Sequence, residues 1–382
     1  MKYYLIAGEA SGDLHGGILM EGLFAEDSHA DVRFWGGPAM EAAGGTKFRD
    51  YGGTAVMGFT DVVRSLGKIS RNLRDCKADI LSWNPDVVIL IDYPGFNMKI
   101  ARFCHESGIR VFYYIAPKTW ASREGRNRRL KAWVERLFII FPFEIPYFDG
   151  TGIPFTYKGN PLVDAVDGHE YARPCPSPYV AILPGSRRSE VSRTLPAAMQ
   201  MADSLHSMPR YGELQFLIAA APSLAQEDYL GFIGDRPYVK LLSGRTYDIL
   251  KYAEAALVNS GTASLEAALT GTPQVVCWSG DAFSVFVARH LLRVQDRIAF
   301  ISLGNLILDR PAFRELIQED FTAEAATAGI REILEDGQVR ARMKEDCSLI
   351  RELLGGTGAG RAVAAEIVAG LKAGKGPGTT CR

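Results

Sequence analysis

The chain has 382 residues, a length that predicts two to three domains of ordinary size. Apolar residues make up 47% of it, enough for sizeable cores, which excludes a largely disordered protein. Its formal net charge of −1 argues against a dedicated nucleic-acid-binding protein, because such proteins are usually basic.

The six cysteines are scattered and include no Cys-x-x-Cys pair, so we expect neither a disulfide framework nor a zinc site, and a reducing compartment fits best. The apolar run from Tyr3 to Ala7 is too short for a signal peptide. No run approaches the roughly 18 apolar residues that a membrane span requires. We therefore expect a cytoplasmic protein whose contact with membranes is peripheral.

Short apolar, β-rich runs alternate with amphipathic stretches along most of the chain. In the first half, strands are predicted near residues 3–7, 32–35, 86–91, 110–114, 136–140 and 155–158. The run 87–91 is apolar at every position, which is typical of a strand covered by helices on both faces and indicates a parallel sheet. The segment 162–178, with prolines near its end, is predicted to be a linker.

The pattern then restarts, with strands predicted near 179–183, 214–219, 238–242, 255–258 and 273–278, and a wholly helical chain from about residue 312. Two successive units of this kind predict an α/β fold of two doubly wound, Rossmann-like domains that face each other across a cleft. We expect a first domain at residues 1–165, completed by a C-terminal helix at 358–382, and a second domain at 175–355.

Ligands of open α/β sheets bind beyond the carboxyl ends of the strands, so the loops there hold the candidate site residues. The first loop, Gly8 to Asp13, is either a capped strand-to-helix turn or a polar floor for the cleft. It lacks the Gly-x-Gly-x-x-Gly spacing of a dinucleotide fingerprint. His15, one turn later, either lines the cleft or is a buried structural histidine.

The second loop begins with Asp92, which ends the most apolar strand of the first domain. This carboxylate either caps the helix that begins near Phe96 or acts as a general base against a sugar hydroxyl. Its position at the mouth of a strand favours the general base.

The third loop follows the first strand of the second domain. Gly185 and Ser186 open a helix whose N-terminal amides attract anions, and Arg187 adds a permanent positive charge. This combination suits a diphosphate better than a solvated helix start.

The fourth loop again opens a helix after a strand. Its small residues Ser260, Gly261 and Thr262 offer amides to phosphate oxygens, and Glu266, about one turn along, can accept both hydroxyls of a ribose. Two such helix starts in one domain predict a nucleotide diphosphate as the ligand. The sequence has no Asp-x-Asp and no histidines at metal-ligand spacing, so we expect helix N-termini and arginine to stabilise the leaving group without a metal.

The four loops, together with other short strings that follow one another along nearly the whole chain, resemble the sequences of the lipid-A-disaccharide synthases. The matching strings are AGEASGDLHG (7–16), FWGGPAM (34–40), AVMGFTDV (55–62), IDYPGFN (91–97), YYIAPKTWASREGR (113–126), FPFE (141–144), GNPLVD (159–164), LPGSRRSE (183–190), NSGTASLEAAL (259–269) and ISLGNLI (301–307). The resemblance implies an inverting glycosyltransferase of the two-Rossmann architecture called GT-B, with no metal and no cofactor.

The resemblance also implies the substrates. UDP-2,3-diacylglucosamine would donate its sugar to the 6-hydroxyl of 2,3-diacylglucosamine 1-phosphate, forming the β-1,6-linked lipid A disaccharide 1-phosphate and UDP. The family's residues match this chain as follows: the motif carboxylate is Asp92, the diphosphate-contacting arginine is Arg187, the nucleotide-side residues are Glu266 and Asn305, and the polar residues of the first loop are Glu9, Ser11 and Asp13.

Acylated substrates imply contact with a membrane, which we expect on the cytoplasmic face of the inner membrane. The stretch 56–81 places cations beside apolar residues at helical spacing, which fits a core helix and an interfacial helix about equally. The apolar loop 55–59 before it is a candidate for contact with acyl chains. A second basic group, which includes Arg123 and Arg126, either binds the acceptor phosphate or anionic lipid or forms a solvated helix face.

Two other functions stay open. One is an enzyme similar to UDP-N-acetylglucosamine 2-epimerase, which shares the architecture but needs no acylated acceptor. The other is a non-catalytic protein that binds a UDP-sugar. Product analysis distinguishes them. The oligomeric state does not follow from the sequence.

Overall fold

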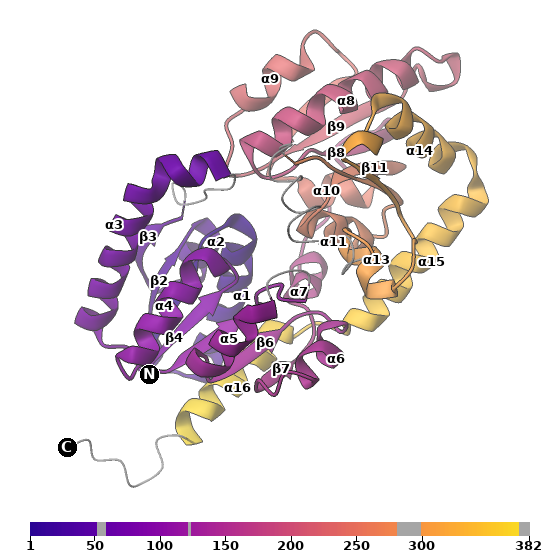
Figure 1. Cartoon of the computed structure of the whole chain (residues 1–382). Helices are drawn as coiled ribbons and strands as arrows, with labels where there is room; N and C mark the ends of the chain where they lie inside the picture. Colours follow the sequence, from indigo (N-terminus) through magenta and orange to yellow (C-terminus); the bar gives the residue numbers. More distant parts are fainter. Residues whose placement is uncertain (52–58, 121–123, 281–298, 374–382) are drawn as a thin grey trace, which may run out of the picture. The chain divides into compact units, whose positions relative to one another are not determined.

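The structure, a computed structural model, describes residues 1–51, 59–120, 124–280 and 299–373 (Figure 1). The chain divides into two compact units. The first unit combines Met1–Asp164 with the segment from Gly356 onward, and the second unit is Ala165–Gly355. Each contains a parallel sheet with helices against it, which confirms the predicted fold of two Rossmann-like units.

The sheet of the first unit has the strand order β3-β2-β1-β4-β5-β6-β7. Its strands are β1 (Lys2–Ala7), β2 (Asp31–Gly36), β3 (Thr46–Asp50), β4 (Val87–Ile91), β5 (Val111–Tyr114), β6 (Arg136–Ile139) and β7 (Phe155–Tyr157). Its helices are α1 (Ala10–Glu26), α2 (Pro38–Ala43), α3 (Phe59–Trp83), α4 (Pro94–Glu106), the 3-10 turn η1 (Glu124–Arg126), α5 (Asn127–Trp133), α6 (Glu144–Asp149), α7 (Pro161–Asp167), which crosses into the second unit, and α16 (Ala359–Ala373). The strand order reverses between β1 and β4, and the carboxyl ends of these two strands form the switch point where ligands of such sheets bind.

The central strands are buried on both faces, as the unbroken apolar run of β4 requires. All five side chains of β4 have no exposed surface. On one face Val88 and Leu90 belong to the same core as Ile80 of α3 and Ile100 of α4. Because helices cover these strands, their apolar side chains are removed from water. This burial is the main favourable contribution to the stability of the unit.

The C-terminal helix α16 packs against α1 at the start of the chain (Figure 1). The contact is close because glycine stands on both sides: a Cβ at Gly22 would lie 2.9 Å from the Cβ of Ala364, and one at Gly360 would lie 2.4 Å from Ile18. An ion pair between Arg361 and Glu26 borders it. These contacts explain why the last helix belongs to the first unit.

The sheet of the second unit has the strand order β10-β9-β8-β11-β12-β13. Its strands are β8 (Tyr179–Leu183), β9 (Gln215–Ala220), β10 (Val239–Ser243), β11 (Ala255–Asn259), β12 (Gln274–Trp278) and β13 (Arg314–Ile317). Its helices are α8 (Arg188–His206), the turn η2 (Pro209–Tyr211), α9 (Glu227–Ile233), α10 (Thr246–Lys251), α11 (Thr262–Leu269), α13 (Leu303–Leu308), the turn η5 (Gln318–Asp320), α14 (Ala323–Glu335) and α15 (Gly337–Leu354). The switch point of this sheet lies between β8 and β11.

Three details differ from the sequence prediction. The chain beyond residue 312 is not wholly helical, since β13 pairs with β12 at the edge of the sheet. The strand β3, at the edge of the other sheet, was not predicted either; edge strands such as these are short and half polar, so they leave little apolar signal. The predicted linker begins with helix α7, where Pro161 takes the first helical position and the Asn160 side chain accepts the amide of Leu162 at 2.9 Å.

In the part of the chain that the structure describes, no helix combines the length and the apolar character needed to cross a bilayer.

Candidate functional site

The first two candidate loops leave neighbouring strands of the first unit. Ala7 of β1 pairs with Ile91 of β4, so the loops that follow these residues lie side by side. The ring of Tyr93 rests directly on Gly8, because a Cβ at Gly8 would lie 2.2 Å from the Tyr93 ring. The half-exposed Glu9 is close as well: burial raises the pKa of Tyr93, and the charge of Glu9 adds to the rise. Ser11, also half-exposed, lies in the first turn of α1.

The mouth of β4 has a costly backbone conformation. Asp92 and Tyr93 both have left-handed φ angles, of 44° and 47°, and Ile115 at the end of neighbouring β5 has a φ of 61°. Each such non-glycine residue costs on the order of 1–3 kcal/mol and persists only where its surroundings hold it. The carbonyl oxygen of Asp92 accepts hydrogen bonds from Asn97 Nδ2 at 2.8 Å and from the Tyr113 hydroxyl at 2.6 Å. Strain of this kind clusters at active sites, which supports a functional role for the loop of Asp92.

The Tyr113 hydroxyl lies near both Asp92 and Arg126, a member of the predicted basic group. Burial and then the negative charge of Asp92 raise the pKa of the Tyr113 hydroxyl, whereas the positive charge of Arg126 lowers it. Asp92 and Arg126 therefore lie near the same hydroxyl. Arg123 and residues 55–58 of the apolar loop lie outside the described residues.

Asp13 has a structural role that the sequence did not indicate. Its buried carboxylate accepts the backbone amides of Gly37, Ala39 and Met40 at 2.6, 2.9 and 3.1 Å. It thereby caps α2, and Gly37 leaves room for it, because a Cβ there would lie 2.9 Å from Asp13 Oδ2. With both oxygens used in this way, the side chain has a structural role, and this arrangement provides no support for its assignment as a substrate contact.

His15 fits the second of its two interpretations, that of a buried structural histidine. The side chain is 2% exposed and its Nδ1 is buried without a hydrogen-bond partner. Burial lowers the pKa of His15 to about 4, so the ring is neutral at physiological pH.

Glu144 is a buried carboxyl group that the sequence analysis did not single out. It accepts the backbone amides of Ile140 and Phe141 at 3.2 and 3.1 Å, and Trp120 Nε1 donates to it at 3.3 Å. Burial raises the pKa of Glu144 to about 7, while these hydrogen bonds act in the opposite direction. The group joins the loops that follow β5 and β6.

In the second unit, the third and fourth loops also lie side by side. Leu183 of β8 pairs with Val258 of β11, and both loops leave the same edge of the sheet. Gly185 lies between them with a left-handed φ of 119°. A Cβ there would lie 2.8 Å from Asn259 Nδ2 on one side and 2.5 Å from the Cβ of Glu190 on the other, so only glycine fits.

The start of α8 already holds a carboxylate. Glu190 accepts the backbone amides of Ser186 and Arg187 at 2.9 and 3.3 Å, and the Arg187 guanidinium donates to it at 2.5 Å. This is a capping box, in which the third helical residue caps the helix start. Glu190 was not among the residues predicted from the sequence, although a glutamate three residues after a helix start is a recognisable signal.

The fourth loop opens α11 with Thr262. Ser260 Oγ donates to the carbonyl of Ile301 at 3.0 Å, and Ser264 Oγ donates to the carbonyl of Gly261 at 2.8 Å, which fixes the loop. Glu266 follows one turn later and is half-buried. Burial raises the pKa of Glu266 to about 7, and a hydrogen bond from the Tyr247 hydroxyl opposes that rise. Tyr247 of α10 is a neighbour that the sequence did not predict.

Asn305 lies inside the second unit with no exposed surface. Its Nδ2 donates to the carbonyl of Phe313 and to Glu315 Oε1, both at 2.9 Å, and its Oδ1 accepts the amide of Phe313 at 2.9 Å. The amide group thus holds β13 to α13. This arrangement gives Asn305 a structural role and provides no support for its assignment as a nucleotide contact.

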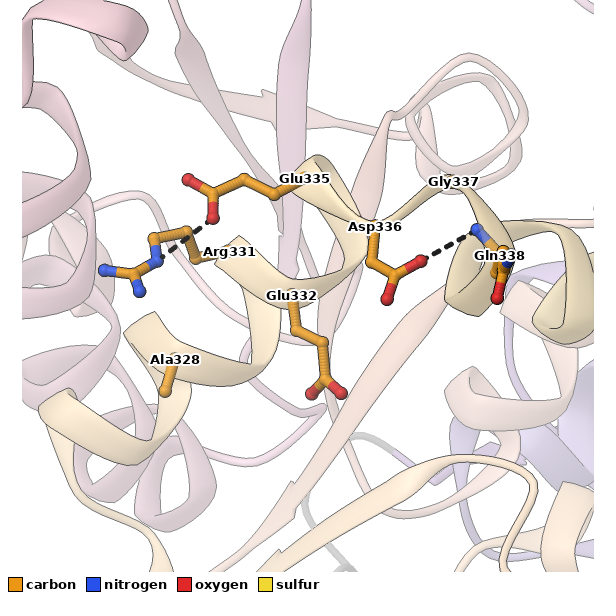
Figure 2. A pocket seen from close by; sticks show the side chains of 7 residues that line it. All are labelled: Ala328, Arg331, Glu332, Glu335, Asp336, Gly337 and Gln338. Carbon is orange, nitrogen blue, oxygen red and sulfur yellow. Dashed lines mark hydrogen bonds and ion pairs between the residues drawn. The ribbon is translucent and has the colours of Figure 1, made fainter.

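A hollow of about 730 Å³ lies at the turn between α14 and α15, and Figure 2 shows the side chains that line it. They largely satisfy one another: Arg331 pairs with Glu335 at 3.4 Å, and Asp336 caps α15 through the amide of Gln338 at 2.8 Å. None of the predicted site residues lines this hollow. Within the described ranges, no cluster of three or more His, Cys, Asp or Glu side chains is suited to hold a metal ion.

Comparison with solved structures finds the same fold in proteins of low sequence identity. UDP-GlcNAc 2-epimerase from Neisseria meningitidis, bound to UDP-GlcNAc, matches with a TM-score of 0.66 at 12% identity, covering 97% of this chain and 100% of that one. The calicheamicin glycosyltransferase CalG4 matches with a TM-score of 0.59 at 16% identity, covering 98% and 99%. At this level of identity the likeness concerns the fold alone, and it agrees with two Rossmann-like units.

Comparison of sequences identifies the family. The lipid-A-disaccharide synthetase family matches residues 3–366. The lipid-A-disaccharide synthase of Syntrophus aciditrophicus is 37% identical over 367 residues, covering 93% of this chain and 94% of the relative. That of Myxococcus xanthus is 34% identical and covers 98% of both chains. The chain therefore belongs to the lipid-A-disaccharide synthetase family.

Proposed function

We propose that this protein transfers 2,3-diacylglucosamine from UDP-2,3-diacylglucosamine to the 6-hydroxyl of 2,3-diacylglucosamine 1-phosphate, with inversion at the anomeric carbon. Membership of the family supports the reaction as a whole. The observation that carries the mechanism is the loop of Asp92, a carboxylate at the mouth of a buried strand whose left-handed backbone is held by Asn97 and Tyr113.

Asp92 is the general base of this mechanism. It removes the proton of the acceptor 6-hydroxyl as the oxygen attacks the anomeric carbon from the face opposite UDP. A single displacement converts the α-linked donor into a β-linked product, and general-base assistance contributes about 10²–10⁴-fold to the rate. The acceptor sugar lies against the loop of Glu9 and Ser11, and Arg123 and Arg126 bind its phosphate. The charge of Arg126 at Tyr113, beside Asp92, supports this placement.

The second unit binds the nucleotide. Arg187 at the start of α8 and the amides at the start of α11, from Ser260 to Thr262, stabilise the diphosphate and the negative charge that develops on it as it leaves. The amides of Ser186 and Arg187, which the sequence offered to the diphosphate, donate instead to Glu190. Glu266 accepts the two ribose hydroxyls, for which its half-buried position one turn into α11 is suited. The two carboxylates thus have different tasks, proton removal and ribose recognition.

The acyl chains of both substrates require access to lipid, and we place the protein peripherally on the cytoplasmic face of the inner membrane. Helix α3 supports this: Asn72, Cys76 and Ile80 are buried, while Lys68, Arg71 and Arg74 are exposed on the helix. Exposed cations of this kind attract anionic lipid head groups. Charge reversal at these three cations should reduce flotation with anionic liposomes, and unchanged flotation would exclude this surface.

The reaction is tested by incubating the purified protein with both lipid sugars, with and without a chelator, and analysing the products. We expect UDP and the β-1,6 disaccharide in both conditions. Asp92→Asn should lower turnover about 10²–10⁴-fold with an unchanged melting temperature. Epimerised UDP-sugar without a disaccharide would instead indicate an epimerase, and UDP binding without UDP release would indicate a binding protein.

A further inference from the structure

We propose that Glu190 is the positioning residue for Arg187 and holds its guanidinium at the start of α8 in the orientation that receives the diphosphate. This inference rests on the proposed function, which assigns the diphosphate contact to Arg187. It gives Glu190 a part in nucleotide binding although its carboxylate does not itself contact the ligand.

Both oxygens of the Glu190 carboxylate are used at this helix start. Oε1 accepts from Arg187 Nη1 at 2.5 Å, and Oε2 accepts the amides of Ser186 and Arg187 at 2.9 and 3.3 Å. The side chains of Glu190 and Arg187 are 20% and 26% exposed, so the pair is partly shielded from water. A charge-assisted bond in such a place is stronger and more directional than an ion pair on an open surface.

The loop leaves Glu190 little freedom to move away. The Cβ of Glu190 lies where a side chain on Gly185 would begin, 2.5 Å from the position of that missing Cβ. On the other side of Gly185 lies Asn259, directly before the fourth loop. The guanidinium is therefore fixed at the edge of the sheet where both helix starts meet, which reduces the side-chain entropy that Arg187 loses when a diphosphate binds.

The chemistry of glutamine separates capping from positioning. A glutamine at this place in a capping box still accepts backbone amides through its one carbonyl oxygen, so the helix start keeps its cap. Its NH₂ group cannot accept from a guanidinium, so Arg187 loses its hydrogen bond to Glu190. Glu190→Gln thus removes the proposed role and leaves the structural one.

The test is a double-mutant cycle on UDP affinity, measured by calorimetry on the full chain. We expect Glu190→Gln to weaken UDP binding roughly tenfold, with a melting temperature within about 2 °C of the wild type. In an Arg187→Ala background the same change should have no further effect, because the two residues act through one contact. The control is Glu254→Gln, which removes the ion pair of Glu254 with Arg340, at 3.0 Å elsewhere in the second unit, and should leave UDP affinity unchanged.

Equal or tighter UDP binding by Glu190→Gln would overturn the inference and make the carboxylate a competitor of the ligand. An equal loss of UDP affinity with and without Arg187 would also overturn it, because the effect would then come from a change in the loop and not from Arg187. A wild-type protein that does not bind UDP, or an Arg187→Ala variant that binds UDP normally, would refute the proposed nucleotide site itself and this inference with it.

Discussion

Replacing Gly8 by alanine should disable the enzyme by displacing the loop of Asp92. The new Cβ would lie 2.2 Å from Cδ1 and 2.3 Å from Cγ of Tyr93. An ordinary contact between carbon atoms is about 3.5 Å, so the ring must retreat by about 1 Å. Because Cγ lies on the axis of the χ2 rotation, turning the ring in place does not relieve the overlap, and Tyr93, which adjoins Asp92, has to move as a whole.

The expected magnitudes follow from this displacement. Overpacking of a tight contact costs about 1–3 kcal/mol of unfolding free energy, so Gly8→Ala should fold with a lowered melting temperature. A displacement of about 1 Å in a catalytic group can cost on the order of 10²-fold in rate. UDP release in the presence of both lipid sugars gives the rate, and thermal unfolding gives the stability.

Gly12→Ala is the matched control, four residues further along and inside α1. The nearest atom to its new Cβ is the Cβ of Ala7 at 3.5 Å, an ordinary contact. It should keep near-normal turnover and gain up to about 1 kcal/mol from helix propensity. Wild-type turnover in Gly8→Ala, or equal damage in both variants, would refute the proposed link between Gly8, Tyr93 and Asp92.

Two further predictions concern buried carboxyl groups. Asp13→Ala should lower the free energy of unfolding by about 3 kcal/mol in a denaturant titration, since three amides at the start of α2 lose their acceptor. As the control, replacement of the exposed Asp31 by alanine should change the free energy of unfolding by less than about 0.5 kcal/mol. Equal effects of the two changes would contradict the capping role. UDP affinity should rise roughly tenfold from pH 6 to pH 8, because the charged form of Glu266, whose pKa burial raises to about 7, accepts the ribose hydroxyls. Glu266→Gln should retain only the pH dependence of UDP itself, and an unchanged profile in this variant would exclude Glu266 as its source.

The sequence predicted the two units and most of their strands, because the signals involved are local. A parallel strand buried on both faces is apolar throughout, as Val87–Ile91 is, and a loop that follows such a strand stands at the ligand-binding edge of the sheet wherever the rest of the chain goes. The loops of Glu9 and Asp92 lie side by side because each follows a strand of this kind and because β1 pairs with β4.

Tertiary structure decided which polar side chains of those loops are committed to the fold. Asp13 and Asn305 have the same functional groups as side chains that contact a ligand. Their hydrogen-bond partners, however, come from segments that the sequence does not place beside them. Asp13 accepts the amides of α2, and Asn305 bonds to the backbone before β13 and to a carboxylate of β13. The same holds for the Tyr247 hydroxyl at Glu266. Burial and hydrogen bonding between distant segments, rather than residue type, distinguish a capping carboxylate from a reactive one, and only the folded chain sets them.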